Sequence, residues 1–157
     1  MTPDQTEERI AALEDIEAIR MLKARYCDLC DQSRDPDAIA ELFTADAVWD
    51  GGAIGRFDGR DAIRGFFRGL PSTLPFARHY VCNPIIEVRG GEASGRWYLL
   101  EPCTFSGPVR AIWGAGRYEE KYVKRSGNWK IKDLKLVSSF WAPFDKGWAR
   151  ESGSSAS

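Results

Sequence analysis

His79 is the only histidine of this 157-residue chain, and it stands near the start of the first of four long predicted strands. An imidazole with a pKa near neutral and a carboxylate partner is the most common general base in proteins. If odd positions of this strand point inward, His79, Val81 and Asn83 face the interior. Arg78 and Tyr80 then face outward. A hydrogen-bonded histidine with a purely structural role is the alternative interpretation.

Two acidic residues are candidates for proton chemistry beside this imidazole. Asp31 lies at the C-terminal end of the first predicted helix, where the helix dipole disfavours a carboxylate, so we expect a cationic or hydrogen-bonding partner for it. A solvated aspartate at a fraying helix end is the alternative. Glu101 shares its strand parity with Trp97 and Leu99. On a concave face, burial would raise the pKa of Glu101 and make it an acid; on a convex face it is an exposed charge.

Cys27 and Cys30 have the C-x-x-C spacing of redox and zinc sites. However, no second pair follows, the histidine is distant in sequence, and both cysteines fall in a helical pattern. We therefore interpret them, together with Cys82 and Cys103, as reduced and partly buried thiols. We expect no bound metal and no cofactor, since the glycine spacing also lacks a dinucleotide-binding motif.

The composition is that of a globular protein, with 43% hydrophobic and 29% charged residues. Aromatic residues reach 12% and include six tryptophans, a surplus that lines ligand pockets or subunit interfaces, or else fills an aromatic core. The 22 basic and 23 acidic residues are interspersed, which argues against a nucleic-acid or membrane partner. The chain shows no signal-peptide pattern and no apolar run of about 20 residues, so we expect a cytoplasmic protein.

Three helices are predicted in the first half of the chain. Apolar residues recur every three or four positions over residues 10–29, the pattern of a helix with one buried face, and Thr6 is its predicted N-terminal cap. Asp35-Pro36 opens a second, short helix. The third helix covers residues 59–69 and is expected to end at Pro71.

Strands dominate the second half. A short hairpin over residues 47–57 precedes four long strands, which are predicted at residues 78–88, 94–105, 111–123 and 129–140. Helices followed by an antiparallel meander define an α+β fold. Because a strongly twisted sheet of long strands curls, we expect a cone-shaped, antiparallel or mixed sheet, with the three helices enclosing an apolar pocket.

Several segments, in this order and spacing, resemble the SnoaL-like, nuclear-transport-factor-2-like superfamily. They are Asp15–Arg20, Lys23–Tyr26, Leu42–Trp49, Arg78–Tyr80 and Gly127–Ile131. The resemblance covers about residues 8–145 and implies a cystatin-like roll forming a single domain over residues 1–157. It also implies a homodimer or homotrimer, with the convex sheet face and the segment 141–148 at the interface. Residues 152–157 are small and polar, and we expect them to be disordered.

Within the superfamily, the chain is most similar to the branch of scytalone dehydratase, hexachlorocyclohexane dehydrochlorinase and bile-acid 7-alpha-dehydratase. This similarity implies a catalytic dyad of His79 and Asp31, a catalytic tyrosine at Tyr26, and an acidic residue for which Glu101 is the nearest match. Scytalone dehydratase has a second histidine where this chain has Cys103, so we do not expect the same substrate here.

The expected function is a cofactor-free β-elimination on a small hydrophobic, steroid-like, aromatic or polyketide molecule. His79 would take a proton from carbon, Asp31 would orient the imidazole, and Tyr26 or Glu101 would donate a proton. Aromatic side chains are expected to exclude water and to bind a ring system; they are Trp49, Phe66, Phe67, Trp97, Trp113, Phe140 and Trp141.

Three alternatives share this cone. An isomerase or cyclase of the ketosteroid-isomerase type would use the same dyad and move a proton within one molecule. A non-catalytic binding protein would keep the cone without the chemistry. A structural subunit similar to the small subunit of ring-hydroxylating dioxygenases would accompany a larger iron protein.

Overall fold

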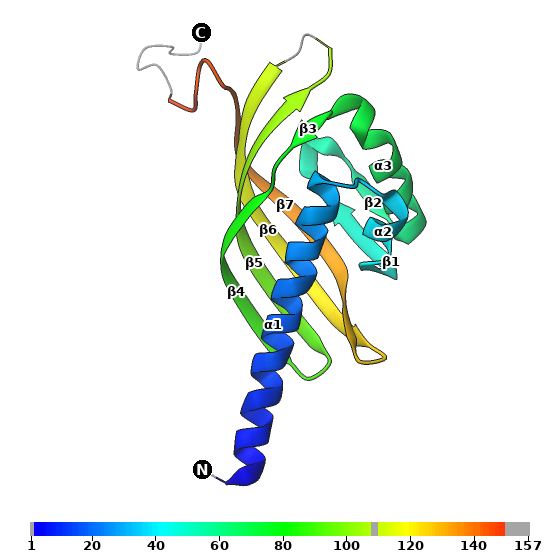
Figure 1. Ribbon diagram of the computed structural model, residues 1–157, viewed down its shortest axis with the longest axis vertical. Helices are drawn as coiled ribbons and strands as arrows, with labels where there is room; N and C mark the ends of the chain where they lie inside the picture. The colour runs from blue at the N-terminus through cyan, green and yellow to red at the C-terminus, as the bar shows by residue number, and fades with distance from the viewer. Residues whose placement is uncertain (1, 108–109, 150–157) are drawn as a thin grey trace.

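A long helix crosses the inner face of a strongly curled β-sheet, and two shorter helices lie beside one end of it (Figure 1). The computed structural model describes residues 2–107 and 110–149. The disorder expected at residues 152–157 therefore concerns a segment outside the described residues. The predicted α+β class is confirmed, with three helices on the concave side of a curved, mixed sheet. No helix within the described residues has the length and apolar character needed to cross a membrane.

Helix α1 spans Pro3–Asp31 and begins earlier than predicted. Its N-terminal cap is Thr2 rather than Thr6, because Thr2 and Gln5 form a capping box in which each side chain bonds the other's backbone N–H. Pro3 occupies the first helical position, where its missing N–H costs nothing. The helix extends beyond the sheet at this end (Figure 1), so Ile10 and Leu13, expected on the buried face, are 50% and 65% exposed.

The two shorter helices are held by different local devices. Helix α2 spans Pro36–Ala40 and begins at Pro36 as predicted; Asp35 caps it, and its carboxylate accepts two backbone N–H groups. Helix α3 spans Arg60–Thr73 and continues past Pro71, where an end was predicted. The hydroxyl groups of Ser72 and Thr73 bond carbonyls one turn earlier, and the N–H of Leu74 bonds the Leu70 carbonyl at 2.8 Å, which closes the last turn beyond the proline.

Within the described part of the chain, seven strands form one sheet in the order β2-β1-β7-β6-β5-β3, and β4 also pairs with β5. Only β1 and β7 run parallel; the other neighbours are antiparallel, which makes the sheet mixed. A 3-10 turn, η1, covers Gly52–Ile54 between the first two strands. The strands are β1 (Phe43–Asp50), β2 (Arg56–Asp58), β3 (Phe76–Ala77), β4 (Tyr80–Arg89), β5 (Glu92–Phe105), β6 (Arg110–Arg125) and β7 (Asn128–Pro143).

The strand predicted over residues 78–88 is interrupted twice. Between β3 and β4, Arg78 and His79 leave the regular strand. Further along, the register with β5 shifts, and Asn83 adopts a left-handed φ of 51°. This bulge turns Asn83 to solvent, so its predicted inward position was wrong, whereas Val81 packs against the core as expected. Tyr80 faces outward as predicted.

The core lies between α1, α3 and the inner face of the sheet. It is built largely from aromatic and branched residues such as Ile19, Phe43, Ile131 and Leu134, each at most 1% exposed. Burial alternates along β5, where Trp97, Leu99 and Glu101 are all buried. The face shared by these three residues is therefore the concave one, and Glu101 points into the cone.

Candidate active site

Asp31 and His79 come together from elements that are far apart in sequence. Asp31 is the last residue of α1, and His79 lies in the break between β3 and β4. Asp31 Oδ1 lies 2.6 Å from His79 Nδ1, and Asp31 Oδ2 accepts the backbone N–H of His79 at 2.9 Å. Because the carboxylate bonds the Nδ1 side, the ring carries its proton on Nδ1 and Nε2 is left as the basic atom.

Arg78 supplies the partner that an acidic residue at a helix C-terminus requires. Its Nη1 donates to the backbone carbonyl oxygens of Asp31 and Ala77, each at 2.8 Å. The guanidinium thus offsets the partial negative charge at the end of α1, next to the Asp31 carboxylate. Arg78 is half-buried, so its predicted outward orientation was wrong. The interruption of the strand gives it this inward contact.

Glu101 lies on the other side of the imidazole. Its Oε1 is 3.8 Å from His79 Nε2, beyond hydrogen-bond distance, and its side chain is 6% exposed. Burial raises the pKa of Glu101 above the ordinary value, and the His79 imidazole opposes this shift. A basic nitrogen and a carboxyl group with a raised pKa therefore face each other across a short gap.

Tyr26 lies one and a half turns before Asp31 on α1 and is 1% exposed. Its hydroxyl oxygen accepts the Nε1–H of Trp49 at 3.1 Å and is also a hydrogen-bond partner of the Cys30 thiol. Its ring packs edge-on against His79, with ring centroids 6.5 Å apart. Burial raises the pKa of Tyr26 well above its ordinary value, so the phenol stays protonated at neutral pH.

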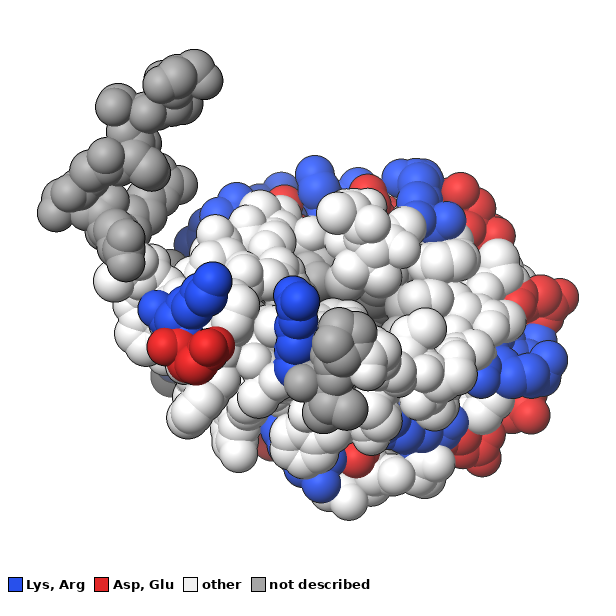
Figure 2. All heavy atoms as spheres, turned by 90° about the horizontal axis from the view of Figure 1, so that it is seen from above, with Lys and Arg blue, Asp and Glu red and all other residues white. Residues whose placement is uncertain are grey.

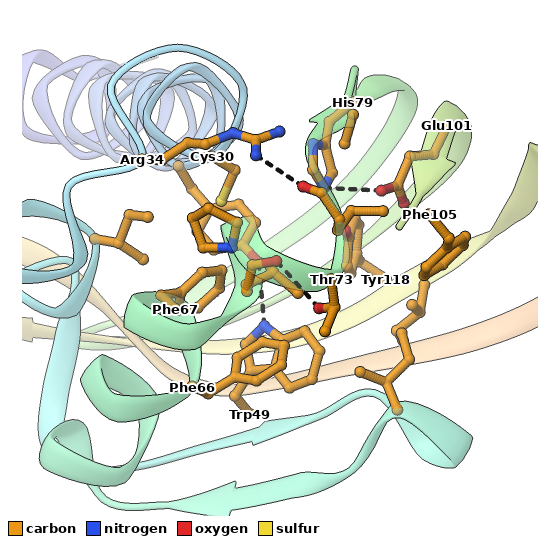
Figure 3. Close-up of a pocket in the computed structure, with 18 of the residues that line it drawn as sticks. Cys30, Arg34, Trp49, Phe66, Phe67, Thr73, His79, Glu101, Phe105 and Tyr118 are labelled. Carbon is orange, nitrogen blue, oxygen red and sulfur yellow. Dashed lines mark hydrogen bonds and ion pairs between the residues drawn. The ribbon is translucent and has the colours of Figure 1, made fainter. Parts of the chain in front are cut away.

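These side chains border a cavity of about 230 Å³ (Figure 3). His79, Glu101 and Tyr26 belong to its lining, and Asp31 stands behind His79. The rest of the wall is mainly apolar. It is formed by Cys30, Arg34, Ile39, Trp49, Ile54, Phe66, Phe67, Leu70, Pro71, Thr73, Leu74, Ala77, Phe105, Tyr118, Leu136 and Trp141.

Four of the seven predicted wall residues line this cavity, and three do not. Trp49, Phe66, Phe67 and Trp141 line it. Trp97, which was also expected there, is buried deeper in the cone, where its Nε1 donates to the Tyr122 hydroxyl at 3.0 Å.

Trp113 and Phe140 are the other two residues that were wrongly placed on the wall. Trp113 stacks on Phe144, and Phe140 stacks on Trp148, away from the cavity. Side chains alternate between the two faces of a strand, so Phe140 cannot share the face of Trp141.

Sequence reasoning missed three polar residues of the wall, Arg34, Thr73 and Tyr118. Tyr118 is 2% exposed and lies on the inner face of β6. It has the same strand parity as Gly116 and Glu120, and this alternation could have indicated its inward position. Arg34 lies in the connection between α1 and α2, where no periodic pattern applies.

Among the described residues, no group of three or more His, Cys, Asp and Glu side chains is placed to hold a metal ion, and the cysteines are therefore not part of such a group. Cys27, Cys30 and Cys103 are buried free thiols, and Cys82 is exposed. Burial raises the pKa of Cys27 to about 11 and that of Cys103 to about 12, which disfavours the reactive thiolate.

The comparison with protein families agrees with this architecture. The model of the SnoaL-like domain matches residues 11–135. The chain belongs to the SnoaL-like domain family. An uncharacterised protein of Mycobacterium tuberculosis is 28% identical to this SnoaL-like domain over 130 residues, which are 82% of the chain and 88% of the relative.

Solved structures share the fold of this SnoaL-like domain. A hexachlorocyclohexane dehydrochlorinase, LinA type 2, superposes with a TM-score of 0.80 at 22% identity, covering 90% of this chain and 96% of the other. A protein of Novosphingobium aromaticivorans with a provisional assignment as a scytalone dehydratase superposes with a TM-score of 0.76 at 24% identity, covering 88% and 97%. The predicted membership is confirmed, and at these identities the structural likeness concerns the fold.

Proposed function

We propose that this SnoaL-like domain is a cofactor-independent lyase that eliminates a leaving group from a small apolar molecule. The observation that carries the proposal is the His79–Asp31 pair at 2.6 Å, which leaves Nε2 as a base at the cavity wall. Dehydration and dehydrochlorination, the reactions in the names of two structural relatives, are both eliminations of this kind.

The elimination would be concerted, or it would proceed stepwise through an enolate. His79 Nε2 takes a proton from a substrate carbon, and Asp31 stabilises the resulting imidazolium. The electrons of the broken C–H bond form a carbon–carbon double bond, and the leaving group departs with its own electron pair. Where the leaving group is hydroxide, Glu101 or Tyr26 donates the proton that makes it water.

The surroundings of the dyad support an apolar substrate. Aromatic side chains make up much of the cavity wall. At one side of it, Phe66 packs against Trp49 at a tilt and stacks on Phe57 behind it. Viewed toward the end where α3 and the β5–β6 hairpin lie, the surface is largely uncharged at its centre, with most charged side chains near the rim (Figure 2). Such surroundings favour a ring system over a polar metabolite.

The proposal is tested with 4-hydroxy-2-tetralone, a β-hydroxy ketone that gives fluorescent 2-naphthol when it loses water. Its acidic C–H lies between the carbonyl carbon and the carbon that carries the leaving hydroxyl. We expect the wild-type chain to form 2-naphthol faster than His79→Gln by about two orders of magnitude or more. Equal rates with the two proteins would refute the lyase mechanism.

Isomerisation is the second candidate, and one distance favours it. With His79 Nε2 and Glu101 Oε1 only 3.8 Å apart, a proton taken from one substrate atom can be returned to a neighbouring atom. A product of unchanged mass, from a β,γ-unsaturated ketone that is converted to its conjugated isomer, would identify this reaction. Ligand binding without any turnover would instead favour a binding protein, and co-purification with an iron protein a structural subunit.

The predicted self-association is part of this proposal. On the outer face of the sheet, Tyr80, Tyr98 and Leu100 are 60%, 54% and 40% exposed, and Tyr80 pairs with Leu100 across β4 and β5. Exposed apolar clusters of this kind mark protein interfaces. We expect a homodimer or homotrimer by light scattering coupled to size exclusion, and a smaller species for Tyr98→Glu.

A further inference from the structure

A single arginine stands in the otherwise mostly apolar cavity wall. Arg34 lies three residues beyond Asp31, in the connection between α1 and α2, and among the described residues it is the only Lys or Arg that lines the cavity. Its backbone adopts a left-handed φ of 54°, which is uncommon for a residue with a side chain. Its N–H bonds the carbonyl of Leu29 at 2.8 Å, so this conformation is held by the end of α1.

The guanidinium is anchored but not neutralised. Its Nη1 donates to the backbone carbonyl oxygen of Leu74 at 2.7 Å, just beyond the end of α3. Two half-buried arginines of α3 differ from it: Arg60 pairs with Glu41, and Arg64 pairs with Asp37. Within residues 2–107 and 110–149, no carboxylate lies at ion-pair distance from Arg34.

A guanidinium has five N–H donors in a planar fork, and the bond to Leu74 uses one of them. The remaining edge of the fork suits two parallel hydrogen bonds to one carboxylate. A half-buried cation without a counter-charge is unfavourable on its own, and an anion bound from the cavity would remove that cost.

We propose that Arg34 binds a carboxylate at one end of the substrate, while the apolar body of the substrate fills the cavity. This inference rests on the proposed function and names its substrate class, an amphipathic molecule with a ring system and a carboxylate. In the view of Figure 3, Arg34 lies on the side of the cavity near His79, and Trp49 and Phe66 lie opposite. A carboxylate at Arg34 would thus fix one end of the molecule on the side where Nε2 acts.

Arg34 is then a specificity-determining residue rather than a catalytic one. Its contact with the carboxylate is the same in the ground state and in the transition state, so its loss should raise KM and leave kcat nearly unchanged. The competing role for Arg34 is purely structural, as a cation that caps the C-terminal end of α3 through Leu74. A capping role affects every ligand equally and does not depend on ligand charge.

The test compares two probes of the same shape, 2-naphthoate and 2-naphthamide, by isothermal titration calorimetry. We expect the wild-type chain to bind the anion about tenfold more tightly than the amide, the effect of a charge-assisted hydrogen bond. Arg34→Gln should bind both probes equally, with unchanged affinity for the amide. Arg34→Lys should retain part of the preference. Arg64→Gln, which removes a nearby arginine that is not part of the cavity wall, is the matched control and should keep the preference.

Three outcomes would overturn the inference. Equal affinity of the wild-type chain for both probes shows that no anion is recognised. A parallel loss for both probes in Arg34→Gln assigns the residue to capping α3. Failure of 2-naphthoate to bind the wild-type chain at millimolar concentration shows that the cavity does not take an aryl carboxylate. Because binding requires no turnover, these outcomes are independent of the rate comparison with His79→Gln, so each proposal can fail alone.

Discussion

The carboxylate of Asp31 holds two donors of His79 at once, the backbone N–H through Oδ2 at 2.9 Å and the ring Nδ1 through Oδ1 at 2.6 Å. Backbone and ring are therefore fixed by one side chain, which defines both the tautomer and the direction of Nε2. His79 lies where the chain passes between β3 and β4. Its neighbour Arg78 donates its backbone N–H to the carbonyl oxygen of Pro102 in β5 at 3.1 Å, and Pro102 has no N–H to donate in return.

Asp31→Asn should lower turnover of a verified substrate by about two to four orders of magnitude. The amide has one oxygen, so it accepts from one donor of His79 and not from both, and the ring is then released to carry its proton on Nε2. Asp28→Asn, on an exposed face of the same helix, is the control and should keep full activity. Steady-state kinetics with the 2-naphthol assay measure the difference. Comparable loss in both variants would contradict the role of the dyad.

Glu101→Gln should change how stability depends on pH. Burial raises the pKa of Glu101 above the ordinary value of 4.5 for a glutamate, so the folded state favours the protonated carboxyl. This contribution to stability is complete below about pH 4.5 and is lost as pH rises through the raised pKa. Glutamine mimics the protonated form, so the variant should gain stability relative to the wild type as pH rises toward neutrality. Urea midpoints measured over this range test it, and parallel curves would contradict it.

The sequence predicted the elements well where a local pattern specifies them. The α+β order, the start of the second helix at Asp35-Pro36 and the long strands follow from periodicity and turn residues. The position of Glu101 was different, because alternation groups it with Trp97 and Leu99 but contains no information on which face of the sheet is concave. Only the three-dimensional curl of the sheet decides that question.

Contacts between distant segments account for most of what the sequence could not predict. Periodicity alone left the roles of Asp31 and His79 open, and the family resemblance paired them. Arg34 lies in a connection without any pattern, and its backbone hydrogen bond to the end of α1 sets its direction. Lys23 is fully buried, and its counter-ion is the carboxylate of Glu120, 97 residues away, a contact that no local pattern indicates.

Tyr26→Phe and Trp49→Phe both remove the hydrogen bond between these two side chains, and together they should separate its effect on stability from proton donation by the phenol. Tyr26→Phe leaves the buried Trp49 Nε1–H without an acceptor and should cost about 1–3 kcal/mol of stability. It also removes the phenolic proton from the cavity and should lower turnover. Trp49→Phe removes the donor but keeps that proton, so activity should fall less for a comparable loss of stability. Thermal unfolding and kinetics on both variants check this, and equal kinetic losses would speak against Tyr26 as a proton donor.

Lys23 and Glu120 form an ion pair with both side chains fully buried. The Lys23 ammonium also lies over the rings of Tyr26 and Tyr118. Lys23→Met leaves the Glu120 carboxylate buried without its counter-charge and should cost about 3–5 kcal/mol. Glu120→Gln added to Lys23→Met removes that charge while its amide oxygen still accepts from the Tyr122 hydroxyl, so the double variant should be more stable than Lys23→Met alone. Urea unfolding of the two single variants and the double variant measures the coupling. Strictly additive losses would show that the pair acts as two independent polar groups and not as one buried charge unit.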